Sequence, residues 1–291
     1  MRRLTIMFVV SSVLMACSGE RDQDQDQEAA LARGAYLVEG IVACGNCHTP
    51  RAADTTAVAE LRLAGGFLIE EPEFRAYAPN ITQDDETGIG TWSDEEIMRA
   101  IREGVRPDGT IIGPPMPILS YRGMSDSDVR AIVAYLRTVP PVRNIVPRSV
   151  FNIPLPDAWG PPLGSVPDVS RDDLLAIGTY LRNALGHCME CHTPMSEGEF
   201  DFSRTGAGGM VFHKPLGMEL AAVAANITPH PERGIGAWTD DEIKRAITQG
   251  ISRDGRRLLP VMAFNYYQNI SDEDLNALIV YLRSLPPQSS Y

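Results

Sequence analysis

Apolar residues recur at helical spacing in one long segment of each half of the chain. The stripe is Val129, Ile132, Val133 and Leu136 in the first half, and Leu275, Leu278, Ile279 and Leu282 in the second. A serine before each segment, Ser125 or Ser271, is a suitable N-cap, and a Pro-Pro pair, 140–141 or 286–287, follows each segment. The pattern therefore predicts two equivalent helices that are bounded at both ends.

Shorter segments predict further helices in each half. Ser93-Asp-Glu-Glu96 and Thr239-Asp-Asp-Glu242 have the form of capping boxes, and glycines at 104 and 250 mark helix ends. Residues 28–42 and 170–185 are also compatible with helix. No run alternates apolar and polar residues for long enough to predict a sheet. We therefore predict an all-α fold.

The two halves are copies of one unit. Asn80-Ile81-Thr82 corresponds to Asn226-Ile227-Thr228, and Trp92 corresponds to Trp238, in each case 146 positions later. Residues 140–169 hold eight prolines and little periodicity, as expected of an extended linker. The sequence thus predicts two tandem helical domains, residues 30–139 and 170–291, joined by the linker 140–169.

Each domain begins with the same chemical motif. Cys44-Gly-Asn-Cys47-His48 and Cys188-Met-Glu-Cys191-His192 are Cys-x-x-Cys-His runs, and each precedes Thr-Pro. In a c-type haem site the two thiols add to the porphyrin vinyl groups, and the following histidine is the proximal ligand. A zinc site or a redox dithiol also uses Cys-x-x-Cys, but neither requires the adjacent histidine. We predict two covalently bound haem c groups, with His48 and His192 as iron ligands.

The repeat also selects a second axial ligand for each iron. Met116 and Met262 lie 146 positions apart in proline-bearing loops, five residues before Tyr121 and Tyr267. A thioether opposite histidine is a known haem ligation that raises the reduction potential. The alternative is that these methionines fill gaps in the core. His213 and His230, which have no counterpart in the first half, are the next candidates if Met262 is not a ligand.

The N-terminus has the features of an export signal. Arg2 and Arg3 precede an apolar stretch over residues 4–16, and Leu14-Met15-Ala16-Cys17 resembles a lipoprotein cleavage box. We expect residues 1–16 to be a signal peptide, Cys17 to carry lipid, and the polar residues 17–29 to form a flexible tether. An ordinary cleaved signal or an uncleaved anchor are the alternatives. The expected location is the periplasm, with a lipid anchor in an envelope membrane.

Two stretches of the sequence resemble a known protein family, and the resemblance extends over nearly all of residues 30–291. They are PNITQDDETGIGTWSDEEIMRAIREGVRPDG and PPMPILSYRGMSDSDVRAIVAYLRTVPP, each with a second-half copy. The chain resembles the cytochrome c subunits of membrane-bound bacterial alcohol, aldehyde and sugar dehydrogenases. The resemblance implies haem attachment at the four motif cysteines, with the motif histidines proximal and Met116 and Met262 distal. Those subunits usually carry three haems, whereas this sequence has two haem motifs.

Charge and motif content narrow the function. The formal net charge of −12 argues against nucleic-acid binding. Three classes then remain: an electron carrier, an accessory subunit of a dehydrogenase or terminal oxidase, and a dihaem peroxidase. The peroxidase needs one iron with an open position, and the matching Met loops argue against it. We therefore expect electron transfer without catalysis, with a dehydrogenase, another cytochrome or a terminal oxidase as partner.

Overall fold

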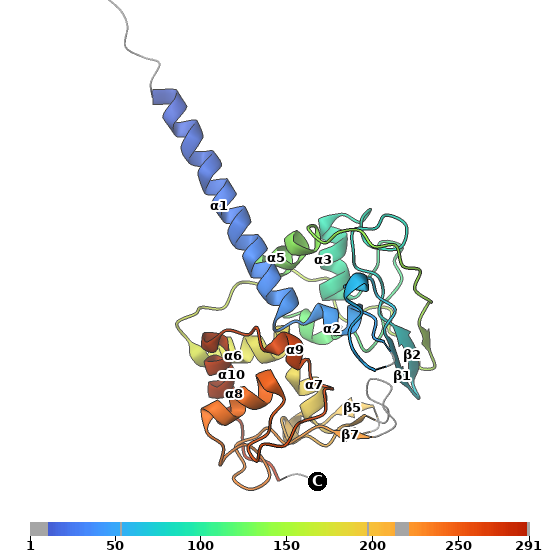
Figure 1. Ribbon diagram of the computed structural model, residues 1–291, viewed down its shortest axis with the longest axis vertical. Helices are drawn as coiled ribbons and strands as arrows, with labels where there is room; N and C mark the ends of the chain where they lie inside the picture. Colours follow the sequence, from blue (N-terminus) through green and yellow to red (C-terminus); the bar gives the residue numbers. More distant parts are fainter. Residues whose placement is uncertain (1–10, 53, 197, 213–220, 290–291) are drawn as a thin grey trace, which may run out of the picture.

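The computed structural model describes residues 11–52, 54–196, 198–212 and 221–289, and for residues 11–23 it describes the backbone alone. Two groups of helices lie side by side, and a long helix projects from the first group (Figure 1). The elements of the first group, in chain order, are α1 (Ser11–Glu39), α2 (Cys44–His48), the 3-10 turn η1 (Ala59–Leu61), β1 (Leu68–Glu71), β2 (Phe74–Tyr77), α3 (Asp94–Glu103), α4 (Ile118–Tyr121) and α5 (Asp126–Leu136).

The second group repeats this order with local differences. Its elements are α6 (Leu174–Tyr180), the π-helical turn η2 (Leu181–Leu185), α7 (Cys188–His192), β4 (Met195–Ser196), β5 (Glu199–Phe200), the 3-10 turn η3 (Phe202–Arg204), β6 (Val211–Phe212), β7 (Ala222–Val223), α8 (Asp240–Gln249), α9 (Phe264–Tyr267) and α10 (Asp272–Ser284). Ser125 and Ser271 cap α5 and α10, and both predicted capping boxes are present at α3 and α8.

A glycine lets the first and last helices of each domain cross closely. In the first domain a Cβ at Gly34 of α1 would collide with the backbone carbonyl of Ala131 in α5. In the second domain a Cβ at Gly178 of α6 would collide with the carbonyl of Ala277 in α10. Interior glycine is unfavourable in a helix by roughly 0.5–1 kcal/mol relative to alanine, so the close packing at the crossing must outweigh that cost.

The hydrophobic core does not stop at the domain boundary. One cluster of buried side chains joins the crossing helices of the first domain to the beginning of α6, η2 and α10 in the second. Leu37, Val129 and Ile132 represent the first domain in this cluster, and Leu181 and Leu278 the second. A smaller cluster lies within the second domain. The two domains therefore bury apolar surface against each other, which favours a fixed relative orientation.

The prediction of an all-α fold was wrong in its detail, because short strands lie between the helices. β1, β2 and β3 (Val150–Phe151) form an antiparallel sheet, while β4–β5 and β6–β7 form two-stranded pairs. Each strand has only two to four residues. Runs this short cannot show the alternation by which a strand is detected in a sequence.

The N-terminal segment also differs from expectation. Residues 17–29 were expected to be a flexible tether, but they are part of the continuous helix α1. Residues 24–29 are all exposed to solvent. They hold neither proline nor glycine, so helix can extend outward from the packed end of α1. The side chain of Cys17 and residues 1–10 lie outside the described residues. Within the part of the chain that is described, no helix is both long and apolar enough to cross a bilayer.

The proline-rich segment 140–169 is extended and lies over the first domain. Its β3 pairs with β2, with Phe151 opposite Phe74 and Val150 opposite Arg75. Further along, the indole Nε1 of Trp159 donates to the Ile112 carbonyl at 2.8 Å. The linker thus contributes a strand and a covering side chain to the domain that precedes it.

Candidate functional site

The four motif cysteines lie on two short helices, α2 and α7. Each helix begins after a residue with positive φ, Ala43 at 51° and His187 at 40°. Residues three and four apart lie on the same side of a helix, so both thiols and the histidine of a motif share one face. All four cysteines are partly exposed, and none of these four forms a disulfide.

Each motif histidine is held through one ring nitrogen. Nδ1 of His48 lies 2.8 Å from the Pro79 carbonyl oxygen, and Nδ1 of His192 lies 2.7 Å from that of Ala225. A carbonyl can only accept a hydrogen bond, so Nδ1 must carry the proton in both rings. Burial lowers the pKa of both imidazoles, which favours the neutral form. The lone pair on Nε2 is then available to a metal, the arrangement found in haem proteins and other metal sites.

The repeated Asn-Ile-Thr turn explains why those carbonyls are in place. The side-chain oxygen of Asn80 accepts from the amide of Thr82 at 2.9 Å and from its hydroxyl at 2.8 Å. Asn226 holds Thr228 in the same way, at 2.9 Å and 2.7 Å. The turns fix the backbone just after Pro79 and Ala225. Sequence reasoning identified the repeated Asn-Ile-Thr motif but missed the two carbonyls, since a backbone oxygen has no residue-type signature.

The two predicted distal methionines occupy equivalent turns. Met116 and Met262 are both partly buried, and each lies two residues before the first residue of a short helix, α4 or α9. The Met116 carbonyl accepts from the Ile118 amide at 2.8 Å, and the Met262 carbonyl accepts from the Phe264 amide at 2.9 Å. The backbone therefore has the same local hydrogen-bond pattern at both methionines. Their assignment as iron ligands remains a prediction.

The surroundings of the four motif thiols disfavour the thiolate form. Burial raises the pKa of Cys44 and Cys191 to about 12 and that of Cys188 to about 11. It also raises the pKa of Cys47. A redox dithiol uses a thiolate whose pKa is lowered, and burial of these thiols acts in the opposite direction. Among the described residues no three His, Cys, Asp or Glu side chains converge as a metal-binding group.

Several buried polar atoms of the protein have no protein partner. They are Nε of Arg51, Nε of Arg182, Nε of Arg245 and the hydroxyl of Thr193, all within the described part of the chain. Arg51 and Arg182 lie close enough to Cys47 and Cys188 to oppose the raised pKa of these thiols. A buried guanidinium N–H without an acceptor suits a ligand that brings anionic oxygens, as haem propionates do. Together with the thiol pairs and the free histidine nitrogens, these atoms fit two covalent haems.

The two motif helices face the domain boundary. The Ser120 hydroxyl of α4 donates to Glu190 Oε1 of α7 at 2.6 Å. The ring of Tyr121 meets that of His187 edge-on, with centroids 6.1 Å apart. Reciprocally, Gly45 of α2 lies against the hydroxyl of Tyr266 in α9, where a Cβ would collide. Each Met-turn helix therefore contacts the cysteine helix of the other domain.

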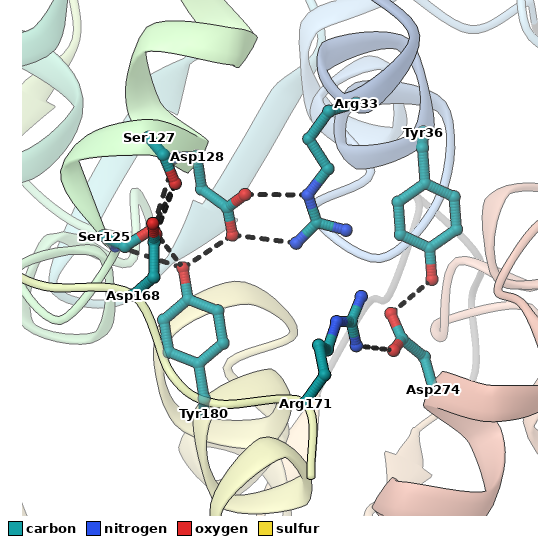
Figure 2. Close-up of polar contacts among 9 residues, drawn as sticks. All are labelled: Arg33, Tyr36, Ser125, Ser127, Asp128, Asp168, Arg171, Tyr180 and Asp274. Atoms are coloured by element: carbon teal, nitrogen blue, oxygen red, sulfur yellow. Dashed lines mark hydrogen bonds and ion pairs between the residues drawn. The ribbon is translucent and has the colours of Figure 1, made fainter. Parts of the chain in front are cut away.

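A second reciprocal contact lies at the crossing helices (Figure 2). Tyr36 of the first domain donates to Asp274 Oδ2 at 2.6 Å, and Tyr180 of the second donates to Asp128 Oδ2 at 2.7 Å. Arg33 binds Asp128 through two hydrogen bonds of 2.7 Å and 2.9 Å. Asp128 and Asp274 are 5% and 1% exposed, so both carboxylates depend on these partners. We name these five residues the interdomain polar cluster.

Of the two alternative histidine ligands, only His230 lies among the described residues. His230 Nδ1 accepts from the amides of Glu232 and Arg233 at 3.2 Å and 3.1 Å, so it closes a local turn. His213 lies outside the described residues.

Comparison with known proteins agrees with this geometry. A family model described as cytochrome c matches residues 31–140 and again residues 176–286. The chain is 32% identical over 94% of its length to the cytochrome c subunit of a quinone alcohol dehydrogenase from Gluconobacter oxydans. It is 32% identical over 90% of its length to the cytochrome c subunit of gluconate 2-dehydrogenase from Pantoea cypripedii. It covers 58% and 61% of those two relatives, about three fifths of their length. A dihaem cytochrome from Cereibacter sphaeroides is 30% identical over 84% of this chain, which covers 82% of that relative.

Proposed function

This chain belongs to the cytochrome c family and holds two covalently bound haem c groups, and we propose that it carries electrons between redox proteins of the bacterial envelope. Each haem supplies a one-electron ferric/ferrous couple. In the first domain Cys44 and Cys47 hold the haem, while His48 and Met116 are the axial ligands. In the second domain Cys188 and Cys191 hold it, while His192 and Met262 are the ligands.

One observation carries this proposal: the two domains present the same set of ligand-bearing turns. The Nδ1–carbonyl bond and the Met turn recur at both sites, so neither domain is built differently for substrate chemistry. A dihaem peroxidase, the alternative, needs an iron with an open or displaceable position. Matching turns favour two six-coordinate irons and therefore a relay.

The position of the motif helices supports transfer between the two sites. α2 and α7 both lie at the domain boundary, where they contact the Met-turn helices α9 and α4. The shared core and the interdomain polar cluster hold the domains in one orientation. A fixed orientation avoids reorganisation when an electron moves from one domain to the other.

The partners and the location are further parts of the proposal. Two relatives are named as cytochrome subunits of alcohol and gluconate dehydrogenases, so a dehydrogenase is the proposed electron donor. Another cytochrome or a terminal oxidase is the proposed acceptor. We also propose a periplasmic location, with Cys17 lipidated after removal of residues 1–16, because residues 14–17 have the lipoprotein form.

An optical redox titration of the purified holoprotein, with mass spectrometry of the denatured chain, tests the core of the proposal. Two haems should remain attached after denaturation, because thioether bonds survive unfolding. Both should be low-spin in the ferric state and should be reduced and reoxidised reversibly. One haem or none, or a high-spin ferric component in the wild type, would contradict the relay.

A further inference from the structure

The loops that lead into the two methionines differ sharply in charge, although their backbones correspond. Residues 103–111 precede Met116 in the same register as residues 249–257 precede Met262. Four changes toward positive charge separate the loops: Glu103 to Gln249, Pro107 to Arg253, Thr110 to Arg256 and Ile111 to Arg257. One change, Arg106 to Ser252, goes the other way. The loop before Met262 is therefore more basic than its counterpart in a chain of net charge −12.

In the first domain the protein covers this region itself. Phe151 of the linker lies against Gly113, where any side chain would collide with its ring. Trp159 lies against Gly104 and donates to the Ile112 carbonyl. Linker and loop share one cavity, lined by Gly109 and Ile111 from the loop and by Asp157, Ala158, Gly160 and Pro162 from the linker.

In the second domain the corresponding region is open to solvent within the described part of the chain. Leu259, which corresponds to Gly113, is 41% exposed. Phe264 lies against Gly250, the place that Trp159 takes against Gly104. Phe264 therefore fills the inner space that the linker residue Trp159 fills in the first domain, and the described residues leave the outer surface of the loop uncovered.

The three arginines of this loop point to a partner of opposite charge. The side chains of Arg253 and Arg256 are 50% and 69% exposed, and Arg257 is also exposed. Arg253 lies 3.6 Å from Glu242, and Arg256 lies 4.0 Å from Asp254. These exposed pairs are loose, so they contribute little and leave the arginines free to change partner. Arg257 has no ion pair with any residue that the structure describes.

We propose that Arg253, Arg256 and Arg257, with Leu259 beside them, form the docking surface for an acidic electron-donor protein. The proposal rests on the function proposed above, because docking here brings a partner next to the Met262 turn. In the encounter the partner's reduced centre would lose one electron and the haem held by Cys188 and Cys191 would gain it, with no bond made or broken. Basic side chains around such a surface act mainly by steering association, an effect that salt screens. The first domain, covered by the linker, is not the entry point.

Stopped-flow reduction of the full-length holoprotein by an acidic flavodoxin in its hydroquinone state tests this surface. The variant R253E/R256E/R257E should lose about tenfold or more in the second-order rate constant at low ionic strength. The difference should shrink as salt is added. The matched control R75E/R143E/R148E changes the net charge equally, at exposed arginines of the first domain and the linker. Its rate constant should change less than twofold.

Other outcomes would overturn the surface. Equal losses in both variants would mean that only net charge matters, and no loss in either would mean that docking lies elsewhere. Retained flavodoxin rates, with binding to phosphatidylglycerol vesicles lost only in R253E/R256E/R257E, would assign the arginines to a membrane surface instead. Haem spectra and potentials separate this proposal from the proposed function. A wild type with two reversible low-spin haems, whose rate is insensitive to these arginines, keeps the function and loses the docking surface.

Discussion

Tyr180 of the second domain donates a 2.7 Å hydrogen bond to the carboxylate of Asp128 in the first, and the same carboxylate accepts two hydrogen bonds from Arg33 of its own domain. Tyr36 and Asp274 make the same contact in the opposite direction at 2.6 Å. The pair of tyrosines and the pair of aspartates are each related by the internal repeat, at offsets of 144 and 146 residues (36 to 180, 128 to 274). The two repeats therefore pack through an interface with approximate two-fold symmetry within one chain.

The first prediction concerns the interdomain polar cluster. Tyr180→Phe and Tyr36→Phe should each lower the free energy of unfolding by roughly 1–3 kcal/mol, since each leaves a buried carboxylate short of one donor. Urea denaturation followed by circular dichroism measures the loss. Tyr77→Phe is the control, because it is a partly buried tyrosine of the first domain, away from the interface. A loss for Tyr77→Phe as large as for the other two would argue against the cluster.

Gly34→Ala and Gly178→Ala should separate the crossing helices. The added methyl would meet the carbonyl of Ala131 or Ala277, and overpacking of this kind costs about 1–3 kcal/mol. We expect a lower melting temperature and reduced yield of haem-loaded protein for both variants. Gly164→Ala is the control, because nothing lies within 4 Å of a Cβ there. Unchanged melting of Gly34→Ala would mean that the crossing is looser than described.

Axial ligation can be tested one domain at a time. Met116→His should lower the potential of one haem and Met262→His that of the other, because a thioether favours ferrous iron and axial ligands tune potentials over roughly 0.8 V. Alanine at either position should introduce a high-spin ferric component and peroxidase-like reactivity. Met98→Leu, at a core-packed methionine of α3, should change neither potential. If Met262→His leaves both potentials unchanged, the sixth ligand of the second haem lies elsewhere.

Acid should weaken the contact between the linker and the first domain by protonating the carboxylate of Asp126. Asp126 accepts from Ser165 at 2.7 Å and from Arg102 at 2.6 Å, and these bonds lower its pKa to about 2, the serine contributing most. A lowered carboxylate pKa stabilises the fold above the ordinary value near 3.8 and loses that contribution as pH falls toward about 2. The melting temperature of Asp126→Asn should therefore lie below wild type at pH 6, and the gap should close by pH 2. A gap of the same size at pH 6 and at pH 2 would contradict this assignment.

Anchoring makes a separate prediction. Cys17→Ser should move the protein from the detergent-extractable membrane fraction to the soluble periplasmic fraction, because the lipid-bearing thiol is lost. Ser18→Ala, at the neighbouring position, should leave the distribution unchanged. A mature wild-type mass that includes residues 1–16 would favour an uncleaved anchor.

Much of the architecture could be read from residues that are close together in the chain. The two Cys-x-x-Cys-His motifs, the capping boxes at α3 and α8, and the capped helices α5 and α10 depend on spacings of a few residues. The 146-residue offset added the pairing of Met116 with Met262. These motifs can be detected in a sequence because local chemistry requires particular side chains at particular positions.

Only the tertiary structure decided which distant groups meet. Nδ1 of His48 meets the carbonyl of Pro79, and β3 joins β2 across more than seventy residues, through backbone atoms that every residue type carries. Tyr36 meets Asp274 because two domains pack in one orientation, and neither residue by itself indicates the other. The sequence by itself determined the cofactor chemistry and the duplication. Packing determined how the copies face each other, since burial and backbone hydrogen bonding depend on the whole fold.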